Sequence, residues 1–162
     1  MRLSILLGGA LVASAAASVA LAAPVSSVAV KISPELQAKA GKRTGRYDQR
    51  DLDYLTRELQ RNIEKRAGVS PDGDRIEVTI TDLKPNRPTF WELSEKPGLS
   101  ALSPSIGGAK LEGVRIAADG QRTPLNFQRY DIDLTQSMFF GLTPWATAQN
   151  TFSGYARKIA QN

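Results

Sequence analysis

Two aspartates, Asp131 and Asp133, have the spacing that most suggests a catalytic pair. They lie two residues apart in a stretch predicted to be a strand, which would place both carboxylates on one face, about 7 Å apart by strand rise. Paired carboxylates can serve glycoside hydrolysis or bind a hard cation. Asp82, at the end of another predicted strand, would join them if the fold brought the two strands together. This acidic cluster predicts a carboxylate-based hydrolase, and a solvated strand face is the alternative.

Most other catalytic and metal-binding arrangements are excluded. The sequence has no histidine and no cysteine, which removes the Ser-His-Asp triad, the Cys-His pair, the usual zinc sites and any disulfide. The serine-nucleophile motifs G-x-S-x-G and S-x-x-K are absent, as are the phosphate-binding motifs G-x-x-x-x-G-K and G-x-G-x-x-G. We therefore expect no cofactor, no bound metal and no catalytic residue that a motif would identify.

A second kind of site is suggested by aromatic residues in a long irregular stretch. Residues 83–108 contain four prolines and carry Phe90 and Trp91 side by side. Loops of this length in a compact domain are uncommon and often functional. We interpret the stretch either as a partner-binding flap anchored by Phe90 and Trp91, or as a cover whose aromatic residues close the edge of the core.

Basic residues gather just before the first long helix. Arg43, Arg46 and Arg50 lie in the segment 39–50, which also carries two lysines and two glycines. This segment is either a second binding surface for an acidic partner or a solvated connection, because a run of charges specifies little by itself.

The N-terminus has the features of a secretory signal peptide. Arg2 precedes an apolar run over residues 6–21, and Ala20-Leu21-Ala22 has the A-x-A form that signal peptidase cleaves. We predict a signal peptide at residues 1–22 and a single mature domain at 23–162, located in the periplasm or secreted. Without cysteine, the chain has no site for a lipoprotein anchor. The formal net charge of +5 becomes +4 once Arg2 is removed (5 − 1).

These features bear on the partners of the mature chain. We expect no membrane span after cleavage of the signal peptide. An exported protein seldom meets nucleic acid, so we expect no nucleic-acid partner. A modest positive charge is compatible with an envelope protein or an anionic envelope component as partner.

Two amphipathic helices must position these residues. Leu52, Leu55, Leu59 and Ile63 form one apolar stripe in a predicted helix over residues 51–67, with Asp48 as a capping residue. The last helix is predicted to begin with Thr143 as N-cap and Pro144 at its first position. Its apolar stripe consists of Trp145, Ala148, Phe152, Tyr155 and Ile159.

The strands are indicated by alternation of apolar and polar residues. Residues 27–32 and 75–82 alternate regularly. Residues 109–133 predict a hairpin with its turn at Asp119-Gly120. In this hairpin the apolar positions change parity near Gly113, and Val114 is expected opposite Leu125, so we predict that both strands change faces there.

Together these elements predict a two-layer α+β fold. We expect a mainly antiparallel sheet of about four strands with two helices packed on one face, in the order β-α-β-β-β-α.

The order of signals also resembles a known kind of protein. Tyr47-Asp48 before a leucine-rich helix, the strand Ile76-Glu77-Val78-Thr79-Ile80-Thr81-Asp82, then Gly107-Gly108-Ala109 and a last helix led by Trp145 are similar to small exported proteins of Gram-negative bacteria from uncharacterised families. Some of these are lipoproteins, and this chain differs from them in lacking the lipid-anchor cysteine. The resemblance implies a non-enzymatic envelope component.

Two functional hypotheses follow. The first is a periplasmic binding or accessory protein that uses Phe90 and Trp91, with Arg43, Arg46 and Arg50 as a second surface. The second is a hydrolase of an envelope polymer that uses Asp82, Asp131 and Asp133. An exposed apolar patch at Phe90 and Trp91 would favour the first, and a deep pocket lined by buried acids would favour the second.

Overall fold

The chain folds into a mixed sheet with helices packed on one of its faces. The structure, a computed structural model, describes residues 23–42, 45–131, 133 and 143–161 of the 162-residue chain. The predicted signal peptide, Arg43 and the connection at 137–142 lie outside the described residues. The elements are β1 (Val25–Ile32), α1 (Pro34–Gln37), α2 (Gln49–Ala67), β2 (Asp74–Lys84), α3 (Phe90–Glu95), β3 (Gly108–Ile116), β4 (Arg122–Pro124), β5 (Phe127–Tyr130) and α5 (Ala146–Ile159).

The sheet is antiparallel except at one edge. Its order is β1-β2-β3-β4, and β5 pairs with β3 beyond the end of β4. β1 runs parallel to β2, whereas β3 pairs antiparallel with β2, β4 and β5. The parallel pair follows from the chain path, because α2 crosses over between β1 and β2 and returns the chain to the same end of the sheet.

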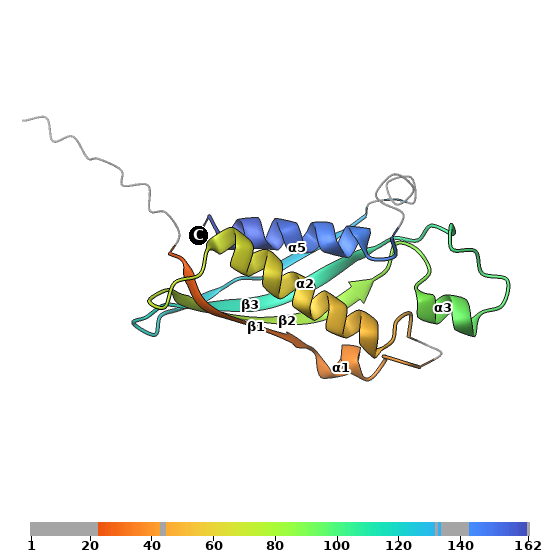
Figure 1. Cartoon of the computed structure of the whole chain (residues 1–162), viewed down its shortest axis with the longest axis horizontal. Coiled ribbons are helices and arrows are strands. Elements are labelled where there is room, and N and C mark those ends of the chain that lie inside the picture. The colour runs from red at the N-terminus through yellow and green to blue at the C-terminus, as the bar shows by residue number, and fades with distance from the viewer. Residues whose placement is uncertain (1–22, 43–44, 132, 134–142, 162) are drawn as a thin grey trace, which may run out of the picture.

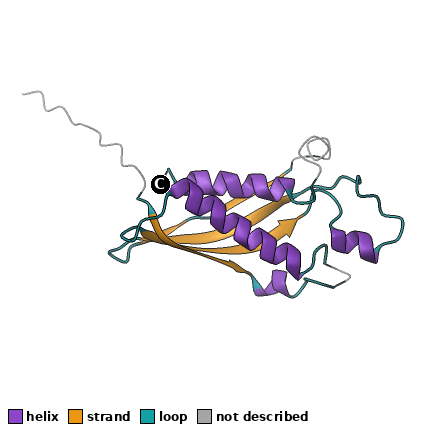
Figure 2. Cartoon of the chain, viewed as in Figure 1, coloured by secondary structure: helices purple, strands orange, loops and turns teal. Residues whose placement is uncertain are grey.

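The two long helices lie side by side over a single face of the sheet (Figures 1 and 2). α2 packs over β1 and against α5, and α5 packs over β3 and β5. The predicted two-layer α+β architecture is therefore confirmed. The short helices α1 and α3 were not predicted, and α3 divides the long stretch between β2 and β3.

Helix α2 forms where its sequence signals predicted it. Leu52, Leu55, Leu59 and Ile63 are all fully buried, and each should contribute about 1.5–3 kcal/mol to the free energy of unfolding. A capping box closes the first turn, in which the Asp48 side chain accepts from the backbone N–H of Asp51 and the Asp51 side chain accepts from that of Asp48. The helix begins at Gln49, two residues before the predicted start.

Helix α5 begins later than predicted. Trp145, not Thr143, is its N-cap, and it makes no side-chain capping bond. The backbone N–H of Thr147 instead donates to the Asn86 side chain at 3.3 Å. A cap supplied by a residue 61 positions away is invisible in the local sequence, which explains the error.

The hairpin of β3, β4 and β5 turns where it was predicted, at residues 117–121. Its register differs by one residue, because Val114 pairs with Pro124 rather than with Leu125. β4 and β5 are separated at Leu125 and Asn126, and the Asn126 side chain accepts from Gly113 N–H in place of a backbone carbonyl.

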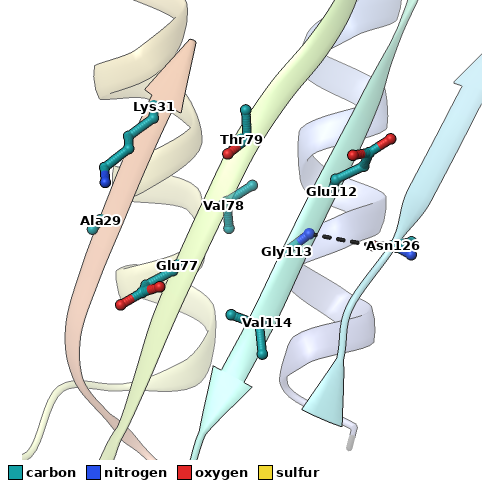
Figure 3. Close-up of a pocket in the computed structure, with 9 residues that line it drawn as sticks. All are labelled: Ala29, Lys31, Glu77, Val78, Thr79, Glu112, Gly113, Val114 and Asn126. Carbon is teal, nitrogen blue, oxygen red and sulfur yellow. Dashed lines mark hydrogen bonds between the residues drawn. The ribbon is translucent and has the colours of Figure 1, made fainter. Parts of the chain in front are cut away.

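The predicted change of faces near Gly113 is wrong. β3 keeps its alternation, with Val114 on the face that carries no helices (Figure 3). The helix-facing position after Gly113 belongs to Arg115, which is only 6% exposed. Because this core-facing position carries a charged residue and the outward position carries Val114, the alternation of apolar residues in the sequence changed parity although the strand did not change faces.

Arg115 joins three distant segments. Its Nε donates to Asp74 at 2.7 Å, its Nη1 to the Ile159 carbonyl at the end of α5, and its Nη2 to the Ala23 carbonyl. The carboxylate and the two carbonyls compensate the burial of this charge. The first described residue is thereby attached to the folded domain.

Gly113 allows the Tyr155 ring to reach the sheet. A β-carbon at residue 113 would overlap the Tyr155 hydroxyl oxygen. Tyr155 is fully buried, and burial raises its pKa, so the hydroxyl stays protonated. Among the described residues, no hydrogen-bond partner reaches this hydroxyl.

We expect Gly113→Ala to lower the free energy of unfolding by about 1–3 kcal/mol, the usual effect of overpacking a core. Tyr155→Phe should restore most of this loss in the double variant, because it removes the atom that the new methyl group meets. Urea unfolding monitored by circular dichroism measures both effects. Tyr155→Phe alone is the control and should stay within about 1 kcal/mol of the parent. Simple addition of the two single effects would contradict the proposed contact.

Candidate functional site

A long loop between β2 and β3 is held in one shape by buried polar residues. This segment, residues 85–107, is called the α3 loop here, and it projects from one end of the molecule in Figure 1. Its polar side chains Asn86, Arg87, Thr89 and Glu92 are at most 5% exposed. Buried polar groups are stable only when they are hydrogen-bonded, so the network that they form defines the shape of the loop.

Arg46 supplies the centre of this network. Its Nε donates to Glu92 Oε1 at 2.9 Å, and its other nitrogens reach the Ser105 hydroxyl and the Pro85 carbonyl. The Thr89 hydroxyl in turn donates to the Arg46 carbonyl. Arg46, which the sequence suggested as a binding residue, thus holds the loop to the segment before α2.

Asn86 fixes the base of the loop to the start of α5. Its backbone N–H donates to the Pro144 carbonyl at 2.8 Å, and its side-chain nitrogen donates to the Thr143 carbonyl. Its carbonyl accepts from Ser105 N–H, which joins the two limbs of the loop. The loop is therefore anchored at both limbs to structured parts of the chain.

Helix α3 itself begins with a capping box. The Thr89 side chain accepts from Glu92 N–H, and the Glu92 side chain accepts from Thr89 N–H. Glu92 also pairs with Lys96 at 3.4 Å. Phe90 is the first residue of this helix, so the capping bonds set the direction in which the Phe90 side chain points.

The two aromatic residues behave differently. Phe90 is 81% exposed. Trp91 is half-buried, and its indole N–H donates to the Lys42 carbonyl at 3.4 Å. Trp91 is thus a contact between the α3 loop and the segment before α2, whereas Phe90 projects into solvent.

Phe90 borders a hollow of about 370 Å³ at the start of α2. We call this the Phe90 hollow, and its lining residues are Asp48, Arg50, Asp51, Tyr54 and Phe90. The Tyr54 hydroxyl accepts from the Gln149 side chain of α5 at 2.7 Å, which orients the ring. The Arg50 side chain is 84% exposed and pairs with Asp48 at 2.9 Å. Of the predicted binding residues, Arg50 and Phe90 line this hollow. Tyr54 was not among them, although its outward position on α2 made it a candidate.

The carboxylates of the hollow are occupied by structural bonds. Burial tends to raise the pKa of Asp48, but bonds from the backbone of Asp51 and from Arg50 outweigh it and hold that pKa below its usual value. Burial is the main cause that raises the pKa of Asp51, partly opposed by a bond from the Trp145 indole. The hollow thus presents two aromatic rings beside an Arg50–Asp48 ion pair.

The three aspartates of the predicted acidic cluster have separate environments. The Asp82 carboxylate accepts from the Tyr130 hydroxyl at 2.7 Å. That of Asp131 accepts from Gly107 N–H and from the Thr147 hydroxyl of α5. Asp133 is exposed. Within the part of the chain that the structure describes, no three acidic side chains gather in a way that could hold a metal ion.

A second hollow, of about 240 Å³, lies on the open face of the sheet (Figure 3). Its lining includes the small residues Ala29 and Gly113 on either side of β2, and the charged residues Lys31, Glu77 and Glu112. It contains no aromatic residue, and its charges are mixed in sign. It therefore indicates no particular ligand.

No protein-family model matches the sequence, and no curated protein is significantly similar to it. Within the described residues, none of the helices is both long and apolar enough to cross a membrane.

We expect Glu92→Gln to loosen the α3 loop, because it removes the charge that Arg46 and Lys96 share. The stability of the loop should fall by about 1.5–3 kcal/mol, the range for a hydrogen bond to a charged group. Amide hydrogen exchange at Leu93 and Ser105 measures it locally. Glu95→Gln, on the same short helix, is the matched control. Unchanged exchange at both amides would show that the Arg46–Glu92 pair does not hold the loop.

Proposed function

We propose that the protein is a non-enzymatic binding or accessory protein of the bacterial cell envelope. It contacts an envelope partner through the Phe90 hollow, with Phe90 as the anchoring side chain and Arg50 and Tyr54 beside it.

One observation carries this proposal, namely the exposure of Phe90 on a loop that is otherwise rigidly built. A flexible loop can hide an aromatic ring against the protein surface. The α3 loop is held instead by the Arg46–Glu92 ion pair and by the bonds of Asn86, so the ring stays 81% exposed. A preorganised loop loses little conformational entropy when it binds.

The composition of the hollow also supports a protein partner. Aromatic residues and arginine are the residue types that contribute most to protein–protein binding energy. Tyr54 and Phe90 supply the aromatic surface. Arg50 pairs with Asp48, but its side chain is 84% exposed, so its guanidinium can also bind a carboxylate of the partner. An envelope protein with an apolar side chain beside an acidic group fits these features.

The proposed location rests on the predicted signal peptide. Cleavage after Ala22 would leave the folded domain whole, because Ala23 is already bound by Arg115 and Val25 is fully buried. The resemblance to small exported proteins of Gram-negative bacteria supports the same location.

We expect the full-length chain, produced in a Gram-negative host, to appear in the periplasmic fraction without residues 1–22. Intact-mass spectrometry of that fraction gives the site of cleavage directly. Replacing Ala20 and Ala22 with bulky residues should keep the precursor uncleaved, since signal peptidase requires small side chains there. A cytoplasmic chain that retains Met1 or Arg2 would contradict export.

We expect Phe90→Ala to weaken partner binding at least tenfold, the size of effect typical of an anchoring aromatic residue. A photoreactive phenylalanine analogue at position 90 should form a discrete adduct in envelope extract. An excess of the parent protein should compete it away, and an excess of Phe90→Ala should not.

The control places the same analogue at Val69, which is 66% exposed and lies outside the hollow. Adduct formation at Val69 equal to that at position 90, or full competition by Phe90→Ala, would refute the proposed role of the hollow.

A further inference from the structure

The two edges of the sheet are built differently. One edge consists of β4 and β5, which are three and four residues long and separated from each other. β4 ends at Pro124. The other edge is β1, which has eight residues and no proline; after a register shift between Val25 and Ser27, its pairing with β2 is regular from Ser27 to Ile32. Short strands and proline are features that keep a sheet edge from pairing with another chain, and a long regular edge lacks that protection.

The hydrogen bonds of β1 show which of its backbone groups are free. Ser33 N–H donates to the Ile80 carbonyl of β2. In a parallel pair, alternate residues direct both backbone groups to the same neighbour. Ala29 and Lys31 therefore face β2 as Ser33 does, and Val28, Val30 and Ile32 direct their N–H and C=O groups away from the sheet. Among the described residues, no bond from a loop, cap or side chain reaches these groups.

The free part of the edge is bounded at both ends. At its start, Val25 forms a parallel bridge with Val69, with bonds from Val25 N–H to Gly68 and from Ser70 N–H to Val25. At its end, α1 begins at Pro34. The stretch 28–32 remains open to an incoming strand.

We propose that a second copy of this chain pairs with β1, strand to strand and antiparallel, about a two-fold axis at Val30. This register places Val30 opposite Val30 of the second copy, and Val28 opposite Ile32 of the second copy. All the outward-directed residues then meet one another as hydrogen-bonded pairs. The result is one continuous sheet with its helices on a single side.

The side chains of the edge are complementary to themselves in this register. Val30 and Ile32, which are only partly buried in the single chain, gain apolar neighbours on the helix side. On the open face, Lys31 meets Ala29 of the second copy and not another lysine. Like charges directly opposite each other destabilise a strand pair, and this register avoids them.

The α2 helices carry polar side chains at the same boundary. Asp51 and Tyr54 face α5, since they bond to Trp145 and Gln149. Gln60 and Glu64 lie on the other side of the helix by its 3.6-residue repeat, and both are half-buried. Within each chain the Gln60 amide donates to the Glu64 carboxylate at 2.8 Å. An antiparallel partner places this pair beside the same pair of the opposite helix, where the bonding can extend across the axis.

This arrangement has a consequence for binding. β1 runs toward the end of the molecule that carries α3 (Figure 1), so a two-fold axis perpendicular to β1 places the two α3 loops at opposite ends of the dimer. A dimer would then offer two Phe90 hollows pointing apart. It would join two partner molecules or two sites on one assembly.

The register makes the charge at position 29 decisive. Ala29→Lys places lysine opposite Lys31 at two symmetric points, and Ala29→Glu places glutamate there. Position 29 is exposed on the open face, so neither variant disturbs the core. We expect the dimer dissociation constant to rise about three- to tenfold for Ala29→Lys and to fall by a similar factor for Ala29→Glu, from two cross-strand pairs.

Sedimentation velocity of the mature chain, residues 23–162, from micromolar to submillimolar concentration measures these constants. Gln128→Lys and Gln128→Glu, at an exposed position of β5 on the other edge of the sheet, are the matched controls and should leave the constant unchanged. Amide exchange at Val28, Val30 and Ile32 should slow as the concentration rises.

Several results would overturn the proposal. A parent protein that stays monomeric over this range would do so, as would Ala29 variants that shift the constant in the same direction. If the protein dimerises but amide exchange at Val28, Val30 and Ile32 does not slow, the interface lies elsewhere. None of these outcomes depends on whether the Phe90 hollow binds a partner.

Discussion

The rest of the structure depends on the packing of two apolar helix stripes against one face of a single sheet. The stripe of α2 covers β1, and the stripe of α5 covers β3 and β5. Leu55 and Phe152, near the centres of these stripes, are fully buried. Because both helices lie on the same face, none of the described helices covers the opposite face or the edge at β1. The surfaces available for binding therefore follow from where the core is placed.

The core is apolar, but the parts that extend from it are held by polar bonds. Arg115 attaches the start of the described chain and the end of α5 to β2. Arg46 and Glu92 attach the α3 loop to the segment before α2. Such bonds are directional, whereas apolar contacts are not. A loop held by directional bonds keeps one shape, and this is how the protein can present Phe90 to solvent without burying it.

Sequence reasoning succeeded where neighbouring residues determine the outcome. This holds for the four leucine and isoleucine positions of α2, for its Asp48 cap and for the alternation in β2. Each depends on residues within one or two helical turns, or within a few residues of the same strand. It failed at Arg115, because a charged residue at a core-facing position is tolerated only when distant carbonyls and a carboxylate receive it. It also misplaced the start of α5, whose cap comes from Asn86. Of the predicted binding residues, Phe90 and Arg50 line one hollow, whereas Arg46 and Trp91 make contacts that hold the loop.

The sequence by itself determined the main helices and strands, the apolar stripes and the absence of histidine and cysteine chemistry. Only the tertiary structure decided that β1 is a free edge, that Phe90 is exposed while Trp91 is half-buried, and that Asp82 and Asp131 bind different partners. The physical reason is the range of the interactions. Helix and strand preferences are set by neighbours a few residues apart. The bonds that place the site join residues far apart along the chain. Arg46 and Glu92 are 46 positions apart, and Asn86 and Thr147 are 61 positions apart.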